Sequence, residues 1–448
     1  MPLVARDLGD LDLYGWVFSA FFLGNLIGIV AAGEMADVGG LERPFLLGLA
    51  LFAIGLAVGG LAPAMGVLVV ARAVQGIGAG AIPAVAYVSI GRQYPSVLRP
   101  HMFAIMSTAW VVPGIAGPAL AGVIAEFLSW RAVFLALLPL VALAAIITTP
   151  PLRGVSAAPH AVRRTESPGD PAVRPAGPAA AHLPRGGRRV VDAVRVAVGA
   201  GLVLAGLDTH DPVRLAVLLA VGLPVGLPAL RRVLPAGALR AASGMPATVL
   251  LRGVLMFGYT GAEAFVPLML VSVRGLSAPE AGLSLTAATV AWAAGSWIQA
   301  RRVATAGAGA LIRAGLALVL AGIALVATAT WSGVPIVVGV AGWGVAGLGM
   351  GMGYSPITLL VLHLAPAGRE GTASAGLQLA DVLGTALGAG VGGIVLATAP
   401  SLGWVEGGAL LATFAIAATA VGGALLLTAR LGPGARAGQA GAGERRAA

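Results

Sequence analysis

The chain has 448 residues, of which 58% are apolar and only 10% are charged. A soluble globular protein of this length carries far more charge, so this composition excludes that class and indicates a polytopic helical membrane protein. The formal net charge is +10, and every basic residue is an arginine. Most of these arginines lie between apolar segments, where they set membrane topology, so no nucleic-acid partner is expected.

Thirteen apolar segments have the length of membrane-spanning helices, with bounds good to a few residues. The segments at 190–207 and 213–230 give weaker signals than the rest. In chain order the thirteen are 14–32, 44–62, 66–90, 102–125, 131–149, 190–207, 213–230, 247–271, 282–300, 310–330, 335–362, 371–397 and 405–428.

Charge in the connecting segments predicts their sidedness. The positive-inside rule places the arginine-rich connections in the cytoplasm, with the C-terminus inside and the N-terminus outside. The alternation holds for all thirteen segments. The cytoplasmic set holds Arg92, Arg99, the segment 150–189, Arg231, Arg232, Arg240, Arg301, Arg302, Arg369 and the tail, and the opposite set holds only Arg6, Arg131, Arg214 and Arg274.

These assignments predict a domain order. Residues 151–189 are rich in proline, alanine and arginine and read as a flexible cytoplasmic linker. The full order is an N-terminal bundle of five helices at 1–150, the linker at 151–189, two additional central helices at 190–232, a C-terminal six-helix bundle at 246–428, and a disordered basic tail at 429–448.

The predicted outside N-terminus is unusual, because no export signal precedes the first span. The simplest explanation is that one N-terminal helix is missing from this chain, through a misplaced start or a truncation. Restoring that helix would give two halves of six helices with an inserted pair between them.

The segment 66–90 is apolar yet carries Arg72 and, one turn later, Gln75. A guanidinium in lipid costs roughly 3 kcal/mol or more, so Arg72 should face protein or water. Gly76 and Gly80 form a G-x-x-x-G step that lets another helix approach closely. This helix is therefore expected to line a polar cavity, although Arg72 could instead only satisfy backbone carbonyls.

Two carboxylates also fall in apolar spans. Asp381 lies near the middle of 371–397, one turn from Gln378. Glu263 lies between Gly261 and Pro267, two helix-weakening residues that predict a local kink. Carboxylates buried in this way are candidates for proton carriers. The alternatives are a hydrogen-bonded structural role for Asp381 and a plain interfacial position for Glu263.

Three motifs resemble those of the major facilitator superfamily, within it the fourteen-helix drug:proton antiporter branch. LVVARAVQGIGAG matches the family's L-x-x-x-R-x-x-Q-G motif, and WVVPGIAGPALAG resembles its antiporter motif. GEMADVGGLERP stands where the family has a charged loop that latches the two halves. The matching positions are Arg72, Gln75 and Gly76 in the first, Gly117, Pro118 and Gly122 in the second, and Gly33, Asp37 and Arg43 in the third.

The resemblance implies two pseudo-symmetric helix bundles with a site near the midplane between them. It also implies proton-coupled export of amphiphilic drugs or other small molecules by alternating access, in the plasma membrane of a bacterium. No cofactor or metal is expected, since the proton gradient supplies the energy, and the expected state is a monomer in the lipid bilayer.

Aromatic residues could line a drug pocket by cation–π attraction, although Trp and Tyr near span ends more often anchor the interface. The candidates are Tyr259, Trp292, Trp297, Trp343 and Tyr354, with Asn25 and Gln299. Two other functions stay open, namely a metabolite uniporter or symporter of the same fold and a truncated membrane protein that does not transport. An enzyme is not expected, because no nucleophile–base pair stands out.

Overall fold

The structure is a computed structural model in which every regular element among the described residues is a helix. These residues are 7–8, 13–95, 97–109, 113, 120–121, 123–125, 127–153, 187–207, 211–366, 368–399 and 403–432. Within them, ten helices are long and apolar enough to cross a membrane. The predicted spans 190–207 and 282–300 are helical but not among the ten, and the predicted span 102–125 is described only in part.

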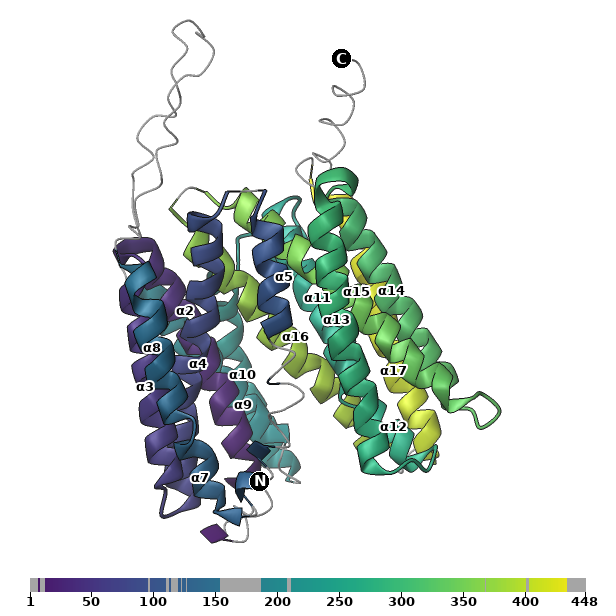
Figure 1. The fold of residues 1–448 in the computed structure, drawn as a ribbon. Coiled ribbons are helices and arrows are strands. Elements are labelled where there is room, and N and C mark those ends of the chain that lie inside the picture. Colours follow the sequence, from purple (N-terminus) through teal and green to yellow (C-terminus); the bar gives the residue numbers. More distant parts are fainter. Residues whose placement is uncertain are drawn as a thin grey trace, which may run out of the picture. The chain divides into compact units, whose positions relative to one another are not determined.

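The helices fall into two compact units (Figure 1). The first comprises Met1–Gln93, Phe134–Val233 and Pro366–Ala375, and the second comprises Tyr94–Val133, Leu234–Ala365 and Gly376–Ala448. The helices of the first unit are α2 (Tyr14–Gly39), α3 (Glu42–Gly60), α4 (Met65–Gln93), α8 (Leu138–Leu152), α9 (Arg188–Leu207) and α10 (Pro212–Val233).

The helices of the second unit are α5 (Arg99–Ala109), α11 (Met245–Glu263), α12 (Val266–Ser272), α13 (Ala278–Ala306), α14 (Ala308–Thr328), α15 (Ile336–Leu364) and α17 (Glu406–Leu427). The short helix α7 (Trp130–Leu135) spans a boundary between the units. Helix α16 (Glu370–Thr398) starts within the first unit and continues in the second.

Glycines let α4 pack closely between α2 and α3. A Cβ at Gly76 or Gly80 would collide with the backbone of α2, and one at Gly24 would collide with the backbone of α4. Gly78 instead faces the backbone of α3, near Gly48. Positions two apart on a helix lie about 200° apart around its axis, so alternate glycines serve two neighbours. The predicted G-x-x-x-G step therefore faces α2.

The same pattern recurs in the second unit, where α15 packs between α13 and α14. A Cβ at Gly347 or Gly351 would collide with the backbone of α13, and one at Gly349 would collide with the backbone of α14 near Gly315. The GLGMGMG run is thus a packing device with two faces. It is the counterpart of the glycines at 76, 78 and 80 in α4.

Proline interrupts the helix within two of the predicted spans, 247–271 and 131–149. Pro267 has no N–H to donate to the carbonyl of Glu263, and α11 ends at Glu263 before α12 resumes at Val266. The kink predicted beside Glu263 is therefore present. Pro139 leaves the carbonyl of Leu135 without a donor in the same way, and α7 ends there.

The glycine pattern yields a stability prediction. Gly351→Leu should lower the stability of the folded protein by about 1–3 kcal/mol or more, because the side chain has no room against α13. Gly344→Leu is the matched control on the same helix, since a Cβ there meets no atom within 4 Å. Thermal unfolding in detergent measures both. Equal melting temperatures for the two variants would contradict this packing.

Candidate functional site

A buried ion pair joins α11 to α16 in the second unit. The side chain of Arg252 is fully buried, and its Nε and Nη2 donate to the two carboxylate oxygens of Asp381. The Nη2 to Oδ2 distance is 3.1 Å. The hydroxyl of Tyr354, from α15, donates to the same Oδ2 at 3.0 Å. Asp381 is thus held by a bidentate guanidinium and a phenol.

The remaining donors of Arg252 face α15. Its Nη1 donates to the carbonyl oxygen of Tyr354 at 2.7 Å and lies 3.4 Å from the hydroxyl oxygen of Thr358. A buried charge pair is tolerated only where such hydrogen bonds complete the shell of each ion. Protonation of Asp381 would break the pair, so the carboxylate and the guanidinium act as one unit.

Sequence reasoning missed Arg252, although a signal was available. It is a lone arginine in the apolar stretch VLLRGVLMFGY, and the logic applied to Arg72 applies equally to it. Its partner Asp381 was predicted as a site residue. Gln378, one turn before Asp381, is also buried.

Glu263 stands in a different environment. It is partly exposed at the end of α11, and its carboxylate has no hydrogen bond or ion pair with the residues that the structure describes. One turn earlier, Tyr259 is fully buried. A carboxylate at a helix break, without a cationic partner in the described chain, is available to a proton or a bound cation.

Aromatic rings connect these two carboxylate sites within the second unit. Tyr259 stacks on Trp343, with ring centroids 4.8 Å apart, and meets Trp292 edge-on at 5.6 Å. Trp292 in turn lies 5.3 Å from the ring of Tyr354, which contacts the Arg252 guanidinium. Four of the aromatic residues considered from the sequence therefore form one chain of contacts.

Arg72 lies in the first unit and contacts α2. Its Nη1 donates to Oε1 of Gln75 at 2.5 Å, and its Nε donates to the carbonyl oxygen of Val17 at 3.2 Å. The guanidinium also lies 4.2 Å from the ring centroid of Phe21. Arg72 forms no ion pair with any acid in the described ranges. Arg72 and Gln75, which lie one turn apart in the sequence, are thus hydrogen-bonded, and the carbonyl contact of the structural alternative is present as well.

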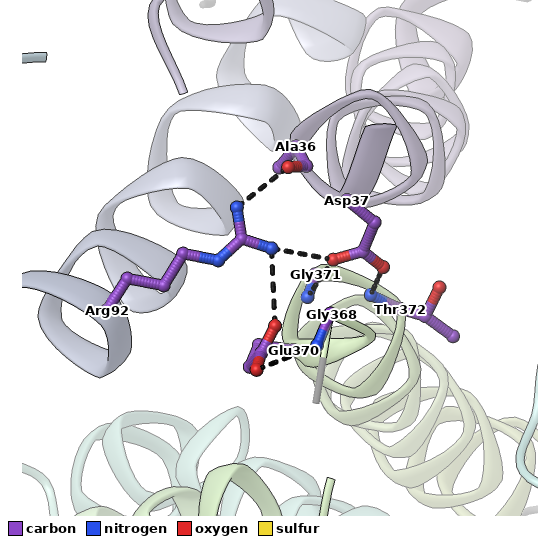
Figure 2. Close-up of polar contacts among 7 residues, drawn as sticks. All are labelled: Ala36, Asp37, Arg92, Gly368, Glu370, Gly371 and Thr372. Carbon is purple, nitrogen blue, oxygen red and sulfur yellow. Dashed lines mark hydrogen bonds and ion pairs between the residues drawn. The ribbon is translucent and has the colours of Figure 1, made fainter. Parts of the chain in front are cut away.

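A second charged network, in the first unit, gathers at the start of α16 (Figure 2). The backbone N–H groups of Gly371 and Thr372 donate to the two carboxylate oxygens of Asp37 at 2.7 and 2.8 Å. Arg92, at the end of α4, lies 3.1 Å from Asp37 and 3.2 Å from Glu370. A carboxylate on the first amides of a helix is stabilised by the helix dipole.

Backbone proximity makes this network possible. A Cβ at Gly33 would collide with the carbonyl of Gly371, and one at Gly371 would collide with the carbonyl of Gly33. Asp37 is helical rather than in a loop, because helix-forming residues extend α2 to Gly39 and the chain turns only at Gly40, with φ of 85°. The boundary predicted at residue 32 was therefore too early.

The other predicted motif residues take no part in these two charged networks as far as the structure describes them. Arg43 is exposed at the start of α3 and has no ion pair with the residues that the structure describes. Gly117, Pro118 and Gly122 lie outside the described residues. Arg92 was expected only as a topology-setting arginine, and its place in the network was not predicted.

The amino-acid sequence is similar to those of bacterial proteins whose names include multidrug resistance or multidrug efflux. The chain is 34% identical over 143 residues to Multidrug resistance protein 3 of Bacillus subtilis, covering 32% of this chain and 28% of that protein. It is 25% identical over 404 residues to a probable multidrug-efflux transporter of Mycobacterium tuberculosis, covering 89% of this chain and 83% of that protein. The first match thus spans less than a third of that relative's length.

Solved structures share the architecture at low sequence identity. A human organic anion transporter superposes with a TM-score of 0.64 at 16% identity, over 92% of this chain and 83% of that one. A bacterial homologue of the iron transporter ferroportin gives 0.65 at 13% identity, over 96% and 92%.

The family model described as Major Facilitator Superfamily matches residues 1–389. This match covers most of the chain and confirms the resemblance of its motifs. The chain therefore belongs to the major facilitator superfamily.

Proposed function

We infer that the chain exports amphiphilic small molecules in exchange for protons, by alternating access. The observation that carries this proposal is the array in the second unit. It places a carboxylate without a cationic partner in the described chain, Glu263, one turn from a chain of aromatic rings that leads to the Arg252–Asp381 pair. Aromatic faces attract lipophilic cations, and a nearby carboxylate binds either the cation or a proton.

Competition for Glu263 gives the coupling. When the carboxylate is ionised, it attracts a cationic substrate that reaches the partly exposed ring of Trp292. When it is protonated, that attraction is lost and the substrate leaves. One group that binds proton and substrate in turn links the two fluxes, because each ligand lowers the affinity for the other.

The Arg252–Asp381 pair has a supporting role in this proposal. A carboxylate held by a guanidinium and a phenol is already compensated, so it competes poorly for a cationic substrate. We therefore assign the proton-exchanging role to Glu263 first. Asp381 takes part only in a state where its pair with Arg252 has opened.

The membrane setting of the chain follows from its family and from its span-length helices. The family and the ten span-length helices among the described residues make this a multi-span membrane protein that handles small molecules. A bacterial plasma membrane, a cytoplasmic C-terminus and a monomeric state extend this proposal. The relatives whose names include multidrug resistance or efflux support the substrate class.

Glu263→Gln should abolish proton-driven efflux, because an amide cannot exchange a proton. Proton-driven transport of a lipophilic cationic dye into everted vesicles should fall to the level seen in wild-type vesicles treated with an uncoupler. Glu42→Gln is the control, since Glu42 makes only a surface ion pair with Arg153. Full, uncoupler-sensitive efflux by the Glu263→Gln variant would refute the assignment.

Removing one member of the buried pair should destabilise the protein. Either Arg252→Leu or Asp381→Leu leaves the other charge uncompensated, at a cost of about 3–5 kcal/mol. The double variant should recover much of this stability. The free energies of unfolding of the wild type, the two single variants and the double variant, measured in detergent, form a double-mutant cycle. If the loss in the double variant equals the sum of the two single losses, the two residues do not interact.

The first residues of α16 should depend on Asp37. Asp37→Ala removes both acceptors of the Gly371 and Thr372 amides, so hydrogen exchange at these two amides should rise about tenfold or more. The amides of α14 serve as an internal reference. Unchanged protection of residues 371 and 372 would contradict the geometry of Figure 2.

A further inference from the structure

Four exposed arginines gather at one end of the helix pair α9 and α10. The two helices pack against each other (Figure 1), and an ion pair between Asp192 and Arg232 brings the start of α9 beside the end of α10. We call the exposed set Arg188, Arg195, Arg231 and Arg232 the arginine cluster. Arg189 is left out because it interacts with Glu34 and Asp37 of α2.

The arginine cluster is not neutralised by the acid beside it. Asp192 is buried, and one of its oxygens, Oδ1, lies 3.2 Å from Arg195 and 3.3 Å from Arg232. Arg188 and Arg231 form no ion pair with residues in the described part of the chain. Four guanidiniums therefore face one carboxylate, which leaves an excess of three positive charges.

An apolar stripe continues from these charges along α9. Val191 and Val198 are each 50% exposed, and they alternate with Arg188 and Arg195 at offsets of three, seven and ten residues. Such offsets place all four side chains on one helix face. Arg195 lies about 10 Å along the axis from the start of the helix, with half of its side chain exposed.

The single carboxylate of Asp192 is shared by Arg195 and Arg232, so the guanidinium of Arg195 still has charge and donors for a second anion beside this exposed stripe. A guanidinium extends toward the headgroup level and binds a phosphate through two parallel hydrogen bonds. The exposed valines beside it can pack against acyl chains, which a lipid has and a soluble anion lacks. A phospholipid with net negative charge supplies both parts, whereas a zwitterionic lipid carries its own cation and leaves the excess charge unmatched.

We propose that the arginine cluster and the exposed valines of α9 form a binding site for an anionic phospholipid. The phosphodiester lies among Arg188, Arg195 and the arginines at the end of α10. One acyl chain follows Val191 and Val198. The positive-inside distribution places this headgroup in the cytoplasmic leaflet.

The test uses the purified full chain titrated with phosphatidylglycerol or phosphatidylcholine in mixed micelles. Native mass spectrometry counts bound lipids, and the melting temperature reports stabilisation. The wild type should bind phosphatidylglycerol about tenfold or more tighter than phosphatidylcholine, and added salt should weaken this preference. A wild type without any preference would overturn the proposal outright.

The variant Arg188→Gln/Arg231→Gln leaves both ion pairs of Asp192 intact and should lose most of the preference. The variant Arg301→Gln/Arg302→Gln, which removes two exposed arginines of α13, should keep it. Arg188→Lys/Arg231→Lys should restore part of it, which covers the case in which the glutamine variant does not fold. The proposal would be overturned if the glutamine variant kept the wild-type preference for phosphatidylglycerol over phosphatidylcholine. It would also be overturned if inorganic phosphate alone stabilised the wild type as much as phosphatidylglycerol does.

Discussion

An ionised side chain in an apolar span has to find an opposite charge, a polar partner or water, and this constraint organises the whole molecule. Arg252 meets Asp381, Arg92 meets Asp37 and Glu370, and Arg72 meets Gln75. Each arrangement completes the shell of a guanidinium, because an unmatched charge in lipid costs several kcal/mol. Among the residues that the structure describes, the carboxylate of Glu263 has no such charged or hydrogen-bonding partner, and an ionisable group of this kind marks a place where function is expected.

Glycine packing makes these pairings possible. The polar side chains meet because α4 approaches α2 to backbone contact through Gly76 and Gly80, and α16 approaches α11 in the same way at Gly384, where a Cβ would collide with the carbonyl oxygen of Gly253. The approach of Gly33 to Gly371 likewise brings the start of α16 to Asp37. Helix α16 then carries both the amides that Asp37 holds and, further along, Asp381. The same helix therefore belongs to both charged networks.

The sequence alone predicted the helical class, most of the spans, the break at Glu263 and the close-packing step at Gly76. These follow from local rules, namely hydropathy, the missing N–H of proline and the size of glycine. The pairing of Arg252 with Asp381 did not follow, because these residues are 129 positions apart and periodicity gives a face but no partner. The extension of α2 through Asp37 was missed for a related reason, since a motif had suggested a loop where helix-forming residues prevail.

The central claim is that one carboxylate exchanges a proton for a cationic substrate. The most direct measurement is the proton balance of binding. Tetraphenylphosphonium would be added to the purified wild-type protein in weakly buffered detergent solution, and the pH followed. The account predicts that binding releases protons and that affinity falls as the solution is made more acidic. Binding without proton release, at an affinity independent of pH, would contradict it.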